Sequence, residues 1–240
     1  MAGHSQFKNI MYRKGAQDAK RAKTFAKIAR EITVAAKLGG TDATANPRLR
    51  AALSLARENN MPKDNVDRAI SKAHGNDDSS NFEDVRYEGY GPSGVAIIVE
   101  GLTDNRNRTA SEIRSIFTKY GGSLGESGSV SFSFERVGHL IYQNISGGFD
   151  KAFEFAIDSG ADNVDDLGDG IVEVITNVEA FSSVRDDFVK KFGDPIESGL
   201  IWIPKNYINC SESAKETLVK LIETLEDNDD VQKVFHNIEE

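Results

Sequence analysis

Charge is distributed very unevenly along this chain of 240 residues, and the imbalance constrains how the chain is organised. The residues up to Gly75 include 15 basic and six acidic side chains, a formal charge of +9. Because the whole chain carries -9, the remainder carries -18. We therefore describe the chain as a basic head on an acidic body. This distribution is typical of a protein that meets polyphosphate with one end and repels it elsewhere.

Composition and length exclude several classes of protein. The hydrophobic fraction of 39% is enough for one large domain or for two or three small ones. The single cysteine, Cys210, cannot form an internal disulfide and indicates a reducing compartment. No run approaches the roughly 18 apolar residues of a membrane span, and the first residues lack the apolar core of a signal peptide. We expect a cytoplasmic protein with no membrane contact.

Hydrophobic spacing predicts three helices in the basic head. The first covers about 16–38, has apolar residues at three-and-four spacing, and stops at a Gly-Gly pair. The second opens with Asn46 as its cap and Pro47 at its first position. The third begins at Pro62 and ends before Gly75.

The first of these helices has one strongly basic face. Stepping about 100° per residue from Lys20 places its cations within a third of the circumference, opposite the apolar stripe. We predict that this face, with three cations that precede it, binds nucleic-acid phosphate; the alternative is a solvated face. The predicted residues are Lys8, Arg13, Lys14, Lys20, Lys23, Lys27, Arg30 and Lys37.

The body alternates between strand and helix patterns after a polar, acidic link. Strands are expected at 95–99, 130–134, 140–142, 171–176, 200–203 and 231–235, and helices at 106–120, 149–159, 180–192 and 213–225. The last helix and strand are too small to bury a core alone, so they complete an interrupted middle domain.

These patterns predict an α+β fold of three domains. The N-terminal three-helix domain covers 1–78, and a small α/β open-sheet domain is discontinuous, covering 79–135 plus 206–240. A second, acidic α/β domain, 136–205, is inserted within it. Both sheets are expected to be open, with helices on one face.

Several short motifs resemble chemical sites without their structural context. The segment 89–94 matches GxGxxG, but a strand follows it instead of a helix, so tight-turn glycines explain it better. The four histidines lack metal-ligand spacing, and no nucleophile has an identifiable base. An acidic run fits a solvated loop better than a cation site; it comprises Asp162, Asp165, Asp166 and Asp169. We predict no catalysis, no cofactor, no metal and no small-molecule substrate.

Two arginines follow a plausible helix cap at Asp104 or Asn105. Arg106 and Arg108 then fall near the first helical turn, where cations oppose the positive end of the helix dipole. The pair could hold a phosphate together with free backbone amides. It could equally pair with carboxylates of the acidic body. We include both in the predicted nucleic-acid site.

Long motifs in this chain resemble the YebC family, which includes mitochondrial translational activators of cytochrome c oxidase. They are GHSQFKNI, RKGAQDAKRAKTFAKIAREI, NPRLR, NMPKDNVDRAI, YEGYGPSGVAIIVEGLTDNRNRT and GGSLGESGSVSFSFERVG. The resemblance runs in order from Gly3 to the C-terminus and implies a helical head with two α/β domains, the third inserted in the second. Gln6 and Phe7 stand where the family often has Lys and Trp, which puts one phosphate contact and one stacking ring in doubt.

The resemblance implies a non-catalytic regulator of gene expression, since family members are described as DNA-binding transcriptional regulators and as translation factors on the ribosome. We expect a nucleic-acid partner, with ribosomal RNA favoured. The basic face is rich in lysine and lacks the Asn, Gln and Arg pattern that reads base edges. The alternative is a DNA-binding transcriptional regulator.

Overall fold

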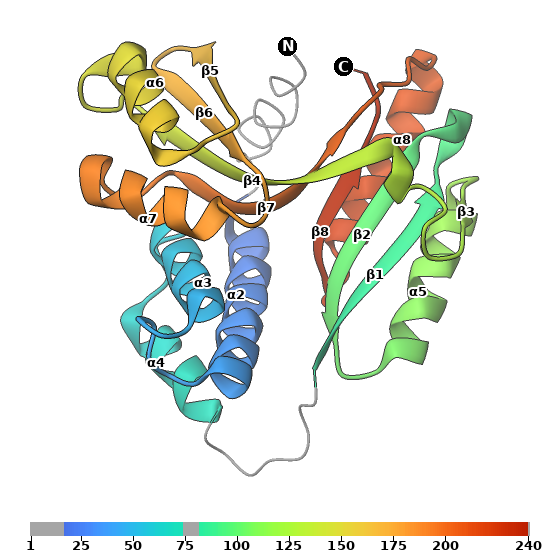
Figure 1. Cartoon of the computed structure of the whole chain (residues 1–240). Coiled ribbons are helices and arrows are strands. Elements are labelled where there is room, and N and C mark those ends of the chain that lie inside the picture. Colours follow the sequence, from blue (N-terminus) through green and yellow to red (C-terminus); the bar gives the residue numbers. More distant parts are fainter. Residues whose placement is uncertain (1–16, 74–81, 240) are drawn as a thin grey trace.

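The computed structural model describes residues 17–73 and 82–239, with side chains from Arg21 onward. Figure 1 shows three parts: a helical head and two sheets, each with its own pair of helices. The α+β class and the arrangement of three domains are as predicted from the sequence.

The head consists of three helices packed around a small apolar core. They are α2 (Gln17–Gly39), α3 (Pro47–Glu58) and α4 (Lys63–Lys72). Asn46 is the predicted cap of α3, and its side chain accepts the amide of Leu49 at 3.0 Å. The same buried side chain donates to the carbonyls of Ala35 and Gly40. One asparagine therefore ends α2 and starts α3, which fixes the angle between them.

The first sheet is antiparallel, with strand order β3-β1-β2-β8. Its elements are β1 (Glu83–Tyr90), β2 (Ala96–Thr103), α5 (Arg106–Lys119), β3 (Ser123–Leu124), α8 (Glu212–Glu226) and β8 (Val231–His236). Ile97 and Val99 of β2 pack with residues of α5 and α8. Ala96 and Ile98 point to the other face, as strand alternation requires. Both faces of β2 are therefore buried.

The second sheet, with order β5-β6-β4-β7, lies between β3 and α8 in the chain. Its elements are β4 (Phe134–Gln143), α6 (Gly148–Ser159), β5 (Asn163–Gly168), β6 (Ile171–Thr176), α7 (Phe181–Phe192) and β7 (Glu197–Pro204). This domain is the predicted insertion. The boundaries at 78, 135 and 205 stay a prediction.

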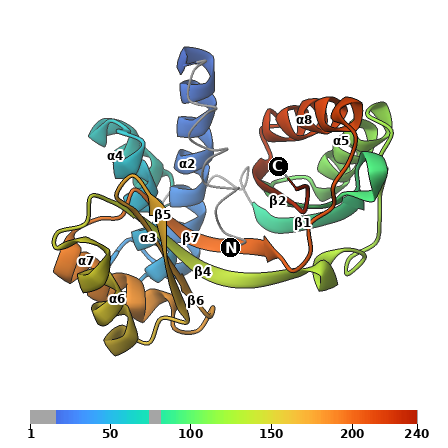
Figure 2. The same cartoon turned by 90° about the horizontal axis from the view of Figure 1, so that it is seen from above.

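The two sheets share an apolar layer where the β4–β7 ribbon crosses toward β2 and β8 (Figures 1 and 2). Its buried residues are Ala96, Ile98, Val130, Phe134, Val137, Ile201, Trp202 and Phe235. The Trp202 indole N–H donates to Glu100 at 2.8 Å. Arg86 and Arg136 both lie over its ring. The insertion is thus fastened to its host domain.

The prediction of a strand at 130–134 is wrong. A 3-10 turn, η4 (Ser131–Ser133), occupies this segment, and β4 begins only at Phe134. The buried Glu88 carboxylate explains the difference, because it accepts the amides of Val130 and Ser131 at 2.9 Å each. Those amides are therefore not available for the hydrogen bonds of a β-ladder.

The acidic run is also a strand in part, not only a solvated loop. Residues Asn163–Gly168 form β5 at the edge of the second sheet. Val164 and Leu167 are buried, while Asp166 stays exposed. A single edge strand can keep charged side chains in water, and such charges protect the edge from pairing with other chains.

The head contacts the insertion through α3, which packs on β7. Arg50 pairs with Asp186 at 3.1 Å across this junction. Glu58, at the end of α3, has a buried oxygen without a hydrogen-bond partner. Burial and the nearby Glu197 and Asp194 raise the pKa of Glu58 from 4.5 to about 8.

We expect Glu58→Gln to raise the melting temperature at about pH 8 and to change it much less near pH 5. The pKa of Glu58 is higher in the folded chain than in the unfolded one, so between 4.5 and about 8 the folded state binds more protons. Stability is therefore lost as the pH rises through this interval. Calorimetry at several pH values checks this, with exposed Glu179→Gln as control. A pH-independent difference would contradict the assignment.

Candidate nucleic-acid interface

The basic face of α2 contacts the end of α8 and the loop that follows it. Lys23 Nζ lies 3.1 Å from the carbonyl oxygen of Asp227 and 3.2 Å from its Oδ1. Lys27 Nζ donates to the carbonyl oxygen of Glu226 at 2.7 Å. Burial lowers the pKa of Lys27, and the neighbouring Glu226 and Asp229 only partly oppose this effect.

Arg30 continues the same face, one helical turn beyond Lys27, and makes three contacts through Nη1. It donates to the carbonyls of Leu102 and Asp229 at 3.0 and 2.9 Å and to Asp230 Oδ1 at 2.9 Å. Its guanidinium group also lies 4.8 Å from the centre of the Phe82 ring. The head is thereby joined to the end of β2 and to the loop after α8.

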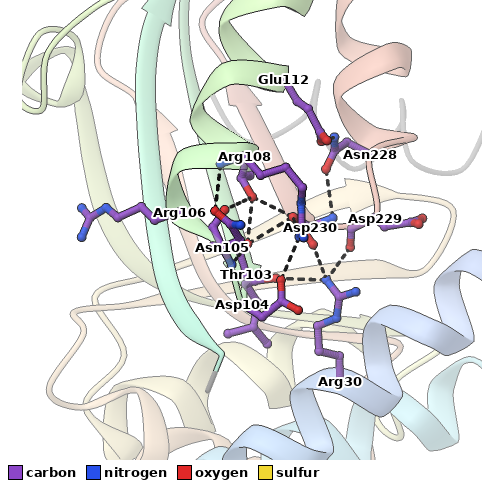
Figure 3. A network of polar contacts seen from close by, with 12 residues as sticks. Arg30, Thr103, Asp104, Asn105, Arg106, Arg108, Glu112, Asn228, Asp229 and Asp230 are labelled. Atoms are coloured by element: carbon purple, nitrogen blue, oxygen red, sulfur yellow. Dashed lines mark hydrogen bonds and ion pairs between the residues drawn. The ribbon is translucent and has the colours of Figure 1, made fainter. Parts of the chain in front are cut away.

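Asp230 is the centre of this network (Figure 3). Its side chain is only 6% exposed. While Oδ1 faces Arg30, Oδ2 accepts from Arg108 at 2.7 Å, Thr109 at 2.7 Å and Thr103 at 3.1 Å. Burial alone would raise the pKa of Asp230, but hydrogen bonds from these residues and the charge of Arg108 lower it overall.

The start of α5 places Arg108 beside Asp230 because Asn105 caps this helix. The Asn105 side chain accepts the amide of Arg108 at 3.0 Å. Arg108 also pairs with Asp104 at 2.9 Å, so it adopts the second of the two arrangements considered from the sequence. Arg106 points away from Asp230 in Figure 3 and is 64% exposed, with Glu83 at 3.7 Å.

A cavity of about 480 Å³ lies among these groups. It is lined by Lys23, Arg30, Arg108, Glu112, Asp227, Asn228, Asp229 and Asp230. Each of its three cations pairs with a carboxylate, Lys23 with Asp227 and both arginines with Asp230, so in this arrangement the cations are already neutralised. The residues gathered here come from all three of α2, α5 and the loop after α8.

The structure brings together four of the residues predicted from the sequence: Lys23, Lys27, Arg30 and Arg108. Lys37 is exposed in the last turn of α2, about two turns beyond Arg30.

The other predicted cations of the head lie wholly or partly outside the residues that the structure describes. Lys8, Arg13 and Lys14 are outside the described residues. Lys20 belongs to α2, but its side chain is outside them. Nucleic-acid contact by any member of the set stays a prediction.

Sequence reasoning missed the acidic partner of the basic face. The run Glu226-Asp227-Asn228-Asp229-Asp230 follows the last predicted helix and was the available signal. Thr103 and Thr109 were also missed, because a lone threonine gives no pattern. Both are fully buried around the Asp230 carboxylate.

Chemistry of other kinds has little support among the described residues. No group of three or more His, Cys, Asp or Glu side chains within 17–73 and 82–239 could hold a metal ion. One buried pair, His139 with Glu173 at 2.8 Å, joins β4 to β6. Within the same ranges no helix has the length and apolar character to cross a membrane.

The fold and the charged network define a class of multidomain protein. In this class a three-helix head is joined to two antiparallel α/β domains. The profile of the TACO1/YebC N-terminal domain matches residues 5–76. The profile of the second and third TACO1/YebC domains matches residues 82–238, and this profile is named for a transcriptional regulator. This chain belongs to the TACO1/YebC family.

The crystal structure of a conserved hypothetical protein, Aq1575 from Aquifex aeolicus, has a similar fold. It is 41% identical in sequence, with a TM-score of 0.82, over 92% of this chain and 91% of that one. The family is consistent with a regulatory role.

We expect Asp230→Asn to lower the free energy of unfolding by about 3 kcal/mol, because it removes a buried charged acceptor that receives hydrogen bonds from Arg30, Arg108, Thr109 and Thr103. Asp229→Asn is the matched control, since Asp229 is exposed and contacts Arg30 only through its carbonyl. Urea denaturation measures both. Equal, small losses for the two variants would show that Asp230 does not organise the network.

Proposed function

We propose that this protein is a non-catalytic, cytoplasmic, nucleic-acid-binding regulator of gene expression that acts on the ribosome through ribosomal RNA. Membership of the TACO1/YebC family supports a regulatory role. The separation of a +9 head from a -18 body supports a polyanionic partner and a preferred orientation on it. No cofactor enters the proposal.

One observation carries the proposal: a single face of α2 receives a row of oxygen atoms. Lys23, Lys27 and Arg30 contact carbonyl and carboxylate oxygens of four of the five residues from Glu226 to Asp230, namely Glu226, Asp227, Asp229 and Asp230. A face that orders oxygens of partial or full negative charge in this way is suited to the oxygens of a phosphate backbone.

Lysine is the main cation of this face, which favours phosphate contact over base reading. Folded RNA is recognised mostly through its shape and its phosphates. Phosphate contacts by a row of lysines on one helix face are suited to this kind of recognition. The second candidate, a DNA-binding transcriptional regulator, would use the same phosphate contacts but needs side chains that reach base edges in a groove.

Sedimentation of a cell lysate separates the two candidates. We expect the protein to migrate with ribosomal particles in a sucrose gradient and to move to the top after ribonuclease treatment. Deoxyribonuclease should leave its position unchanged. Loss of fast migration with deoxyribonuclease alone would favour the DNA-binding alternative, and absence from heavy fractions in untreated lysate would contradict the ribosomal one.

We expect Lys23→Glu combined with Lys27→Glu to weaken binding to oligouridine and oligothymidine alike, by at least about tenfold at moderate salt. Loss of two phosphate contacts should also reduce the slope of log K against log salt by about 1.4 for single strands. Fluorescence anisotropy over a salt series measures both quantities.

The matched control for this charge reversal is Lys190→Glu with Lys191→Glu on α7, which makes the same change of charge on the exposed surface of the insertion. An equal effect of the two double variants would mean that net charge, not the α2 face, governs binding.

A further inference from the structure

We propose that the acidic segment 226–230 occupies the place of nucleic acid on α2, so that the head binds nucleic acid only after this segment is displaced. This inference rests on the proposed function. It adds that the contact between head and body is a closed clasp, formed by Lys23, Lys27 and Arg30 against the segment.

The segment imitates a polyanion through two features. Glu226 is the last residue of α8 and Asp227 is its C-cap, so their carbonyl oxygens lie at the negative end of the helix dipole. Lys23 and Lys27 bind these carbonyls. Carboxylates at Asp227 and Asp230 add full negative charges to the same row.

The clasp is weak at one end and strong at the other. Lys23 and Asp227 are 43% and 63% exposed, and a pair so open to solvent contributes little and weakens further in salt. Asp230, at the far end, is buried. Opening should therefore begin at Lys23, where an approaching phosphate strand meets the most accessible cation.

Asp230 keeps three of its four side-chain partners when the head leaves. Arg108, Thr109 and Thr103 all belong to the domain that carries Asp230, and all three bind its Oδ2. Only Arg30 comes from the head. The departing Arg30 can then bind phosphate, while the buried carboxylate keeps its charged partner. Opening thus strands no buried charge on the body, which makes a reversible clasp feasible.

Two perturbations of the full-length chain test the clasp, with fluorescent oligouridine as the probe. Asp227→Asn removes the exposed ion pair and should raise affinity by about fivefold. Asp158→Asn makes the same change of charge on exposed α6 and should raise it much less.

The second perturbation locks the clasp covalently. Lys23→Cys and Asp227→Cys are combined with Cys210→Ser and joined by a short, reducible bismaleimide. The locked protein should lose oligouridine binding, and reduction of the disulfide in the linker, which leaves half of the linker on each cysteine, should restore it to about the level of the single-cysteine variants treated with the same reagent. Each single-cysteine variant treated with the same reagent controls for modification alone.

The possible failures are distinguishable. If the unmodified protein binds neither oligouridine nor ribosomes, the proposed function is wrong. If it binds, but the locked chain binds equally well and Asp227→Asn matches its control, the clasp proposal is overturned and other cations make the contact.

Discussion

The position of the head depends on one buried carboxylate, that of Asp230. Its two oxygens join α2, through Arg30, to the start of α5, through Arg108 and Thr109. Its own carbonyl accepts the amide of Leu102 at the end of β2. A buried charge is tolerated only when it is paired, so Arg108, Thr103 and Thr109 stay on Asp230, while Arg30 holds the head to it in the closed arrangement.

The head is attached at two junctions whose pH dependences have opposite signs. At the Asp230 junction the carboxyl pKa is lowered, so its contribution is present above the ordinary value of 3.8 and is lost as the pH falls through the lowered one. At the α3–β7 junction the pKa of Glu58 is raised to about 8, and stability is lost as the pH rises toward that value. Both contributions are therefore fully present together only between about pH 3.8 and 4.5, and the Glu58 contribution declines as the pH rises from there toward 8.

Local signals in the sequence predicted most of the fold. Asn46 and Pro47 marked the start of α3, because a cap and a proline act within one turn. The apolar run at 171–176 matched β6, since its residues are buried on both faces. The prediction of a strand at 130–134 failed because Glu88, far away in the chain, accepts hydrogen bonds from the backbone amides of Val130 and Ser131.

The partner of the basic face could not be predicted for the same reason. Spacing placed Lys23, Lys27 and Arg30 on one side of a helix, but no pattern says what that side meets. The answer lies about two hundred residues further on, in the segment after α8. For Arg108 the sequence left two alternatives, phosphate or carboxylate, and only the folded chain brings Asp230 to it.

The distance between head and body tests the central claim most directly. Spin labels at Lys72→Cys on α4 and Lys220→Cys on α8, both exposed, can be placed in a Cys210→Ser chain and measured by double electron-electron resonance. We predict one narrow distance for the protein alone and a longer, broader distribution with saturating oligouridine. An unchanged narrow distance in the bound protein would contradict a clasp that must open.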